Sequence, residues 1–180
     1  MGKVMQAIDE ELSRWITSQR MFFVASAPSG DGGHINCSPK DTASLRILGP
    51  TSVAWVDLTG SGVETVAHLR DNGRIVLMFC AFEGAPQIVR LHGRGEVLRP
   101  DHAEFAGLLQ RFERRELGVR SIIRVECTRI GTSCGFGVPL FDFAGERDIL
   151  ATWADKKGPD GVEQYWRDRN AESLDGLPGV

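Results

Sequence analysis

The chain contains the stretch Val-Ala-Trp-Val-Asp-Leu-Thr-Gly-Ser-Gly-Val-Glu from Val53 to Glu64, and this stretch decides the fold. Its first four residues are apolar and rich in β-formers, which predicts a buried strand. The Thr-Gly-Ser-Gly sequence of residues 59–62 permits a tight loop. Apolar residues at helical spacing follow as far as the Asn-Gly stop at residues 72–73. A second apolar strand over residues 74–79 completes a unit of strand, loop, helix and strand.

The loop of this unit has the composition of an anion site. Free backbone N–H groups at a helix start, together with the positive end of the helix dipole, attract phosphate. The hydroxyls of Thr59, Ser61 and Thr65 can converge on the same point. Gly-Ser-Gly is also common in ordinary turns, so the loop alone leaves both interpretations open.

Composition restricts the class of protein. A chain of 180 residues with 42% hydrophobic content is expected to be one globular domain spanning residues 1–180. The net charge of −3 is spread along the chain, which argues against nucleic acid or an anionic membrane as partner. No segment approaches the ~20 apolar residues of a membrane span, so a cytoplasmic protein is expected.

The cysteines and histidines indicate no metal site. The four cysteines, Cys37, Cys80, Cys127 and Cys134, stand far apart without a Cys-x-x-Cys pair, which argues against a zinc site and a disulfide framework. The four histidines are scattered over predicted strands and helices. We therefore expect them to be structural, and no catalytic residue is identified.

The remaining elements follow from periodicity. An opening amphipathic helix is expected from Val4 to Ile16, and a capping-box-like Pro100-Asp101 with Glu104 predicts a helix start near residue 100. Strands are expected over residues 21–27, 34–38, 45–48, 88–98 and 121–130, with a bulge or bend at Gly93 and Gly95. Further helices are expected around residues 149–153 and 165–166. The apolar C-terminal tail is expected to pack against the protein. This order predicts a mainly β protein with peripheral helices (α+β), built on a closed antiparallel β-barrel.

A dinucleotide-binding fold is the rival interpretation. Gly60-Ser61-Gly62 follows a strand and opens a helix, and Glu83 lies about twenty residues further on, where a ribose-binding carboxylate belongs. Thr65 replaces the third glycine, however, and a hairpin precedes the unit. A Rossmann-type NAD(P)-binding protein is therefore the weaker alternative.

The sequence resembles the pyridoxamine 5′-phosphate oxidase-related FMN-binding split barrels. The resemblance is carried by residues 22–25 (Phe-Phe-Val-Ala), 34–40 (His-Ile-Asn-Cys-Ser-Pro-Lys), 53–62, 68–73 (His-Leu-Arg-Asp-Asn-Gly) and 93–95 (Gly-Arg-Gly). Residues 20–100 correspond to the family core. Residues 131–180 look like the extension of one subgroup, expected to pack on the barrel or on a dimer mate.

The resemblance implies a homodimer with FMN at the subunit interface and a small-molecule substrate. It implies that Ser38 and Lys40 meet the phosphate or ribityl chain, and that Asp57 faces the flavin edge or caps the turn. The loop residues that would surround the phosphate, here called the cradle, are Thr59, Gly60, Ser61, Gly62 and Thr65. The candidates for the segment of the dimer mate near the flavin ring are Gly135, Phe136, Gly137 and Trp153. Taken alone, Lys40 is more simply a surface lysine. Trp153 is equally compatible with the core.

The implied activity is that of an FMN-dependent oxidoreductase with an unassigned substrate, in which the cofactor supplies the chemistry. The sequence departs from the true oxidase, which carries an Arg-x-His clamp near its C-terminus. Here the last histidine is His102, so oxidation of vitamin B6 is not expected. A flavin- or haem-binding protein without turnover, or a deazaflavin in place of FMN, stays open on the same barrel.

Overall fold

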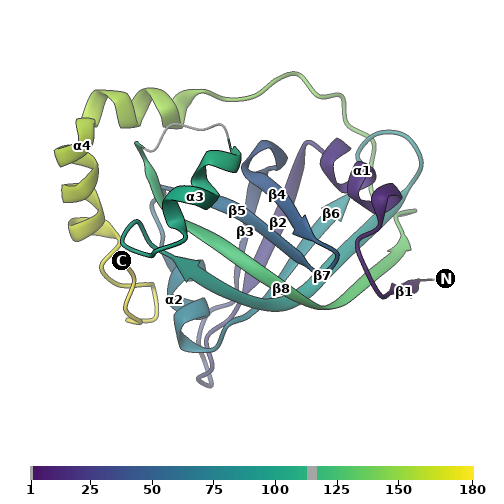
Figure 1. Cartoon of the computed structure of the whole chain (residues 1–180), viewed down its shortest axis with the longest axis horizontal. Helices are drawn as coiled ribbons and strands as arrows, with labels where there is room; N and C mark the ends of the chain where they lie inside the picture. Colours follow the sequence, from purple (N-terminus) through teal and green to yellow (C-terminus); the bar gives the residue numbers. More distant parts are fainter. Residues whose placement is uncertain (1, 113–116) are drawn as a thin grey trace.

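The computed structural model describes residues 2–112 and 117–180 (Figure 1). Its strands are β1 (Lys3–Met5), β2 (Met21–Ser26), β3 (Asn36–Asp41), β4 (Leu45–Gly49), β5 (Ser52–Leu58), β6 (Arg74–Cys80), β7 (Gln87–Leu98) and β8 (Val119–Cys134). Its helices are α1 (Glu10–Ser18), α2 (Glu64–Asp71), α3 (Phe105–Leu109) and α4 (Ile149–Arg169), with 3-10 turns η1 (Thr42–Ser44) and η2 (Gln110–Phe112).

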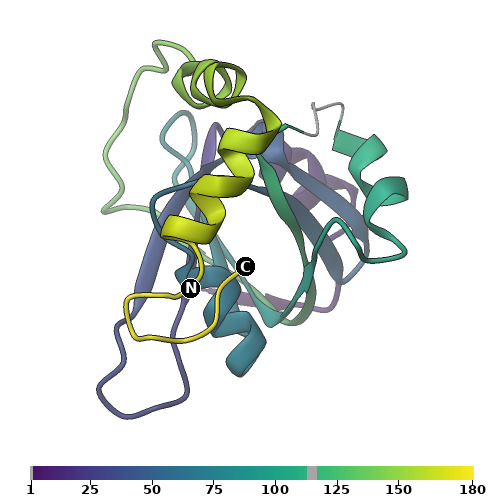
Figure 2. The same ribbon diagram turned by 90° about the vertical axis from the view of Figure 1, so that its left-hand side faces the viewer.

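The strands form one curled antiparallel sheet in the order β3-β2-β6-β7-β8-β5-β4, with β1 added on β8. Figures 1 and 2 show the sheet curving around an interior, with the helices at its rim. The predicted fold class, a mainly β split barrel with peripheral helices, is confirmed. The predicted closure of the barrel is wrong, because β3 and β4 are the two ends of the strand order and do not pair with one another in the described part of the chain. Every pairing among the described strands is antiparallel. The Rossmann-type alternative is wrong, because that fold needs parallel strands.

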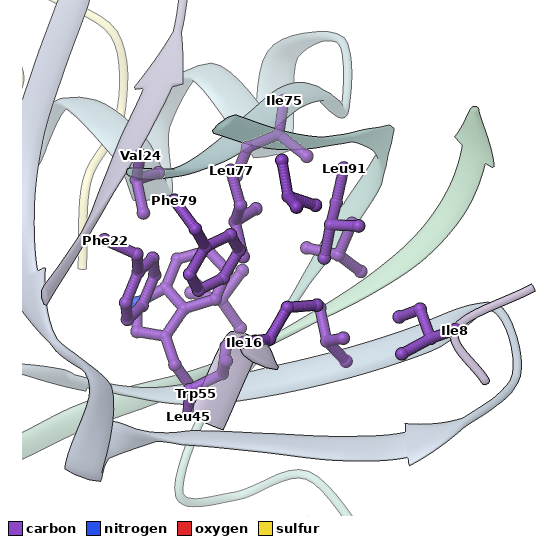
Figure 3. Close-up of a cluster of buried hydrophobic side chains, with 14 of the residues drawn as sticks. Ile8, Ile16, Phe22, Val24, Leu45, Trp55, Ile75, Leu77, Phe79 and Leu91 are labelled. Carbon is purple, nitrogen blue, oxygen red and sulfur yellow. The ribbon is translucent and has the colours of Figure 1, made fainter. Parts of the chain in front are cut away.

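Apolar side chains from the inner face of the curled sheet fill its interior. Figure 3 shows the rings of Phe22, Phe79 and Trp55 grouped at its centre. Phe22 stacks on Phe79 at 5.3 Å between centroids, and meets Trp55 edge-on at 6.1 Å. Leu12 and Ile16 of α1 are buried against this cluster. The alternating burial of β2 follows from this packing, because successive side chains point to opposite faces of a strand.

Two predicted helix starts were wrong. The opening helix begins at Glu10, because the Asp9 carboxylate caps it by accepting from the Leu12 N–H at 2.8 Å. Val4 pairs instead with Gly131 as part of β1. The later helix begins at Phe105, because the Glu104 carboxylate bonds Arg124 at 2.7 Å instead of capping the helix. The sequence predicts a strongly charged far end for this helix, and residues 113–116 of that end lie outside the described residues.

The bend predicted in the long strand over residues 88–98 is present. The register between β7 and β8 shifts between His92 and Gly93, so the bulge lies at the first of the two glycines. A Cβ at Gly93 would overlap the carbonyl oxygen of Glu126 and lie 2.8 Å from Val125 Cγ1. The two longest strands, β7 and β8, can lie this close at the bulge because residue 93 has no side chain.

The chain after β8 forms an irregular segment and then α4, which bends where Gly158 adopts φ 65° ahead of Pro159. Figure 2 shows the two halves of α4 at an angle to one another. The C-terminal tail turns back, and the Val180 N–H bonds the Asn170 carbonyl at 2.9 Å. Within the described ranges, no helix is both long and apolar enough to cross a bilayer.

We expect Gly93→Ala to lower the free energy of unfolding by about 1–3 kcal/mol, because the added methyl group overpacks the bulge between the paired strands β7 and β8. Chemical denaturation followed by tryptophan fluorescence measures this change. Gly30→Ala is the control, since a Cβ at Gly30 meets nothing within 4 Å. Equal stabilities for the two variants would contradict this account of the bulge.

Candidate functional site

The loop between β5 and α2 lies at one end of the barrel. The N-cap position of α2 is Val63, and no side chain caps the helix. Ser, Thr, Asp or Asn ordinarily occupies that position and accepts a first-turn N–H. The first turn of α2 is therefore left without a side-chain acceptor beside the Gly-Ser-Gly loop, an arrangement suited to an anionic ligand.

A cavity of about 280 Å³, here called the polar cavity, opens beside this loop. Three polar side chains of β3 line it: Asn36, Ser38 and Lys40. It is also lined by Asp57, Leu58, Gly60, Ser61, Gly62, Glu64, Thr65 and Arg120. The structure thus brings together Ser38, Lys40, Asp57, Gly60, Ser61, Gly62 and Thr65 of the residues predicted from the sequence.

Hydrogen bonds order part of the polar cavity and leave part of it free. Asn36 Nδ2 donates to Thr65 Oγ1 at 3.0 Å, and Ser38 Oγ donates to Asn36 Oδ1 at 3.1 Å. The Ser61 hydroxyl has no hydrogen-bond partner within residues 2–112 and 117–180. Lys40 Nζ lies 4.0 Å from Asp57 Oδ1, beyond hydrogen-bond distance. Donors thus remain available at Ser61 and Lys40.

Arg120 organises the inner wall of the polar cavity and is not among the residues predicted from the sequence. Its side chain is buried; Nε donates to Asp57 Oδ2 at 2.8 Å, and Nη1 donates to the Gly62 carbonyl at 2.9 Å and to Asn170 Oδ1 at 2.8 Å. The formal charges of Lys40 and Arg120 cancel those of Asp57 and Glu64 among the lining residues. The only sequence signal for Arg120 is a charged residue directly before a β-rich run.

Thr59 lies beside the loop, but its hydroxyl is engaged elsewhere. It donates to the Gly118 carbonyl at 2.9 Å and accepts from Trp166 Nε1 at 2.8 Å. Asn170 Nδ2 adds a bond to the Gly60 carbonyl at 3.2 Å. Thr59 therefore attaches the loop to α4, and its hydroxyl does not line the polar cavity.

A second cavity, of about 480 Å³, lies on the other side of the loop and is called the aromatic pocket. Trp153 and Tyr165, one from each half of α4, meet there edge to face at 5.0 Å between ring centroids. Gly60 and Ser61 form the opposite wall. The structure therefore brings Trp153 to the loop within one chain.

A third cavity, of about 610 Å³, is called the large cavity and adjoins the other two. It shares Lys40 and Leu58 with the polar cavity, and Arg147 and Leu150 with the aromatic pocket. Met21, Pro39, Leu117 and Phe143 add apolar surface to it. The three cavities therefore surround the β5–α2 loop.

Gly135, Phe136 and Gly137 lie elsewhere in the chain. They follow the far end of β8, where Cys134 pairs with Gln87, whereas the loop lies near Val119 at the other end of this 16-residue strand. Phe136 is 82% exposed. The chain does not bring these residues to its own loop, and their position opposite a second subunit's flavin stays a prediction.

His68 is a fully buried residue of α2 outside the three cavities. Its Nδ1 lies 3.0 Å from Ser26 Oγ, while Nε2 has no hydrogen-bond partner in the described part of the chain and lies 4.0 Å from Asp175 Oδ2. Burial lowers the pKa of His68, and the nearby Asp175 carboxylate partly opposes this. Hydrogen bonds from His34 lower the pKa of Asp175 in turn.

The matching family model, described as pyridoxamine 5′-phosphate oxidase, covers residues 8–134. The chain belongs to the pyridoxamine 5′-phosphate oxidase family. A curated relative, the pyridoxamine 5′-phosphate oxidase family protein ustO of Aspergillus flavus, is 39% identical over an alignment of 191 positions that covers 97% of this chain and 76% of ustO. The family recognised from residues 22–95 is thereby confirmed.

Solved structures of low sequence identity share the fold of this family member. HupZ from Group A Streptococcus superposes with a TM-score of 0.56 at 22% identity, covering 68% of this chain and 91% of HupZ. The FAD binding protein from Mycobacterium smegmatis gives a TM-score of 0.50 at 14% identity, covering 73% of this chain and 97% of that protein. At identities this low, the likeness shows a common fold.

We expect Thr59→Val to cost about 1–3 kcal/mol of stability, because the substitution leaves Trp166 Nε1 without its acceptor while the Thr59 hydroxyl is lost. Thr17→Val is the matched control, since the Thr17 hydroxyl bonds only backbone carbonyls of its own helix at the surface. Urea denaturation of both variants measures the difference. A Thr59→Val protein as stable as the control would contradict the role of Thr59 in attaching the loop to α4.

We expect protonation of the buried His68 to lower the stability of the folded protein in acid. Because the pKa of His68 is lowered in the folded protein, the unfolded chain binds the proton more readily. The neutral His68 ring therefore contributes its full stability above the unfolded pKa of about 6.5. This contribution is lost as the pH falls toward the pKa of the folded protein. We expect His68→Asn to flatten the dependence of the unfolding midpoint on pH below that value.

Thermal unfolding between neutral and mildly acidic pH measures this slope. His102→Asn is the control, since the His102 ring accepts only the backbone N–H of Glu104 at the surface. A slope that persists in His68→Asn would assign the acid sensitivity to another group.

Proposed function

We propose that this protein binds FMN at the β5–α2 loop and acts as an FMN-dependent oxidoreductase on a small-molecule substrate. The observation that carries the proposal is the uncapped start of α2, which opens into a cavity containing the free Ser61 hydroxyl and the Lys40 ammonium. These groups suit a phosphate. Ser38 and Thr65, which line the same cavity, complete the set of side chains that we assign to the phosphate and ribityl chain.

The shapes of the cavities support a ligand with one anionic end and one apolar end. The polar cavity continues past Lys40 and Leu58 into the large cavity, which has apolar walls. FMN has a phosphate at one end and a wide planar ring at the other. We assign the phosphate to the polar cavity and the ring to the large cavity.

Charge distinguishes this cradle from a strongly basic phosphate site. Glu64 lines the polar cavity, but its carboxylate accepts the Leu174 N–H at 3.2 Å. Asp57 is satisfied by Arg120 and Ser121. Arg120 offsets the charge of Asp57, so Lys40, the start of α2 and neutral donors supply the attraction for the phosphate against one remaining carboxylate, that of Glu64. When bound, FMN supplies hydride or electron transfer, while the protein supplies position and electrostatics.

Family membership and the exposed surface support two further parts of the proposal. The Mycobacterium smegmatis protein of this fold is described as FAD binding, which supports a flavin as the ligand here. Phe136, Leu140, Phe141 and Ile149 are exposed apolar side chains in the segment between β8 and α4. Such surface ordinarily marks an interface, which supports a homodimer whose mate adds Gly135, Phe136 and Gly137 to the flavin site. We propose the cytoplasm as the location of this dimer.

The absorption spectrum of the purified protein tests for a bound flavin. Mass spectrometry then identifies the compound that heat denaturation releases. FMN is the expected compound. A colourless protein that takes up no added FMN would overturn the proposal. Turnover of an electron acceptor with a nicotinamide donor would then distinguish an enzyme from a protein that only holds the flavin.

Lys40→Met tests the cradle. We expect the dissociation constant for FMN to rise about tenfold, because a charge-assisted contact to the phosphate is lost. Lys3→Met is the charge-matched control on the exposed strand β1. Quenching of flavin fluorescence gives both constants. Equal affinity for FMN in the two variants would show that Lys40 does not contact the phosphate.

A further inference from the structure

We propose that the aromatic pocket binds an aromatic carboxylate, and that this compound is the substrate of the flavin reaction. The role as substrate rests on the proposed function, whereas the binding site rests on the pocket alone. The pocket lies against Ser61, which also lines the polar cavity. It also shares Arg147 and Leu150 with the large cavity, to which we assign the flavin ring, so a ligand held there adjoins the reacting end of the cofactor.

The walls of the aromatic pocket select a flat, apolar ligand. Trp153 and Tyr165 present a ring edge and a ring face to one another, with 76° between their planes. A third aromatic ring can add to such a pair by the same offset or edge contacts. Ile149 is 66% exposed beside them, so an apolar ligand would also remove its side chain from water.

The charge of the pocket selects an anion. Arg147 is its one charged lining residue. The guanidinium of Arg147 has no ion-pair or hydrogen-bond partner among residues 2–112 and 117–180. Since a guanidinium binds a carboxylate through two parallel hydrogen bonds, a carboxylate is the group that Arg147 fits.

The bend in α4 fixes this arrangement before any ligand binds. Gly158 lets the helix turn back, so Trp153 and Tyr165 come from its two halves. Trp166, next to Tyr165, donates to Thr59 and holds the second half against the loop. A pocket built in advance loses little conformational entropy on binding.

Matched pairs of small probes test the inference by calorimetry at constant ionic strength. The pairs are indole-3-acetate with indole-3-acetamide and benzoate with benzamide, which differ in charge and hardly in shape. We expect at least one acid to bind about tenfold more tightly than its amide. If neither acid binds more tightly than its amide, the proposal is overturned.

Arg147→Gln should abolish the preference for the acid while changing the affinity for the amide by no more than about twofold. Arg14→Gln, on the exposed face of α1, is the control and should keep the preference. Trp153→Leu should weaken the acid and the amide together, because it removes the ring contact. A preference that survives Arg147→Gln would place the anion elsewhere and overturn the assignment.

Repeating the titrations with saturating FMN separates this inference from the proposed function. Binding of the acid in the presence of FMN, with Arg147 still required, supports the substrate site. Competition between FMN and the acid would make the pocket part of the flavin site and overturn the inference. A chain that takes up no FMN but keeps the Arg147-dependent preference would remove the flavin function and leave the aromatic-carboxylate site standing.

Discussion

The buried guanidinium of Arg120 is the constraint on which the site depends. A charge removed from water is tolerated only when paired and hydrogen-bonded. Arg120 meets this requirement through three segments far apart in the sequence: Asp57 on β5, the Gly62 carbonyl in the loop, and Asn170 at the end of α4. Satisfying one side chain therefore fixes the strand, the loop and the C-terminal helix relative to one another.

Bonds around Arg120 extend the same organisation. Thr59 connects the loop to Gly118 and Trp166, and Asn170 reaches back to the Gly60 carbonyl. The loop that we assign to the phosphate is held mainly by its carbonyl oxygens and by Thr59. Its hydroxyl at Ser61 and the start of α2 remain available to a ligand, so the cradle is ordered without consuming the groups that it needs.

Local pattern was enough to predict most of the barrel from the sequence. The run Val53–Leu58 and the Gly-Ser-Gly loop gave correct elements because their hydrophobic period and turn residues act over a few residues. The helix start predicted near residue 100 was wrong because Glu104 has a distant partner in Arg124, and the first helix start was wrong because Val4 pairs with Gly131. Arg120 and Asn170 were missed for the same reason: their roles arise from contacts across 50 residues of chain, which no local period records.

The two halves of the site come from different parts of the chain. Every residue that lines the polar cavity lies within residues 8–134, the region that matches the family model. Arg147, Trp153 and Tyr165 of the aromatic pocket all lie beyond it. The structure joins the regions at Ser61, which faces both cavities. Changes at Arg147 and Trp153 can therefore alter which compound is held beside the loop while the bonds of Arg120 to Asp57 and to the Gly62 carbonyl keep the proposed phosphate cradle in place.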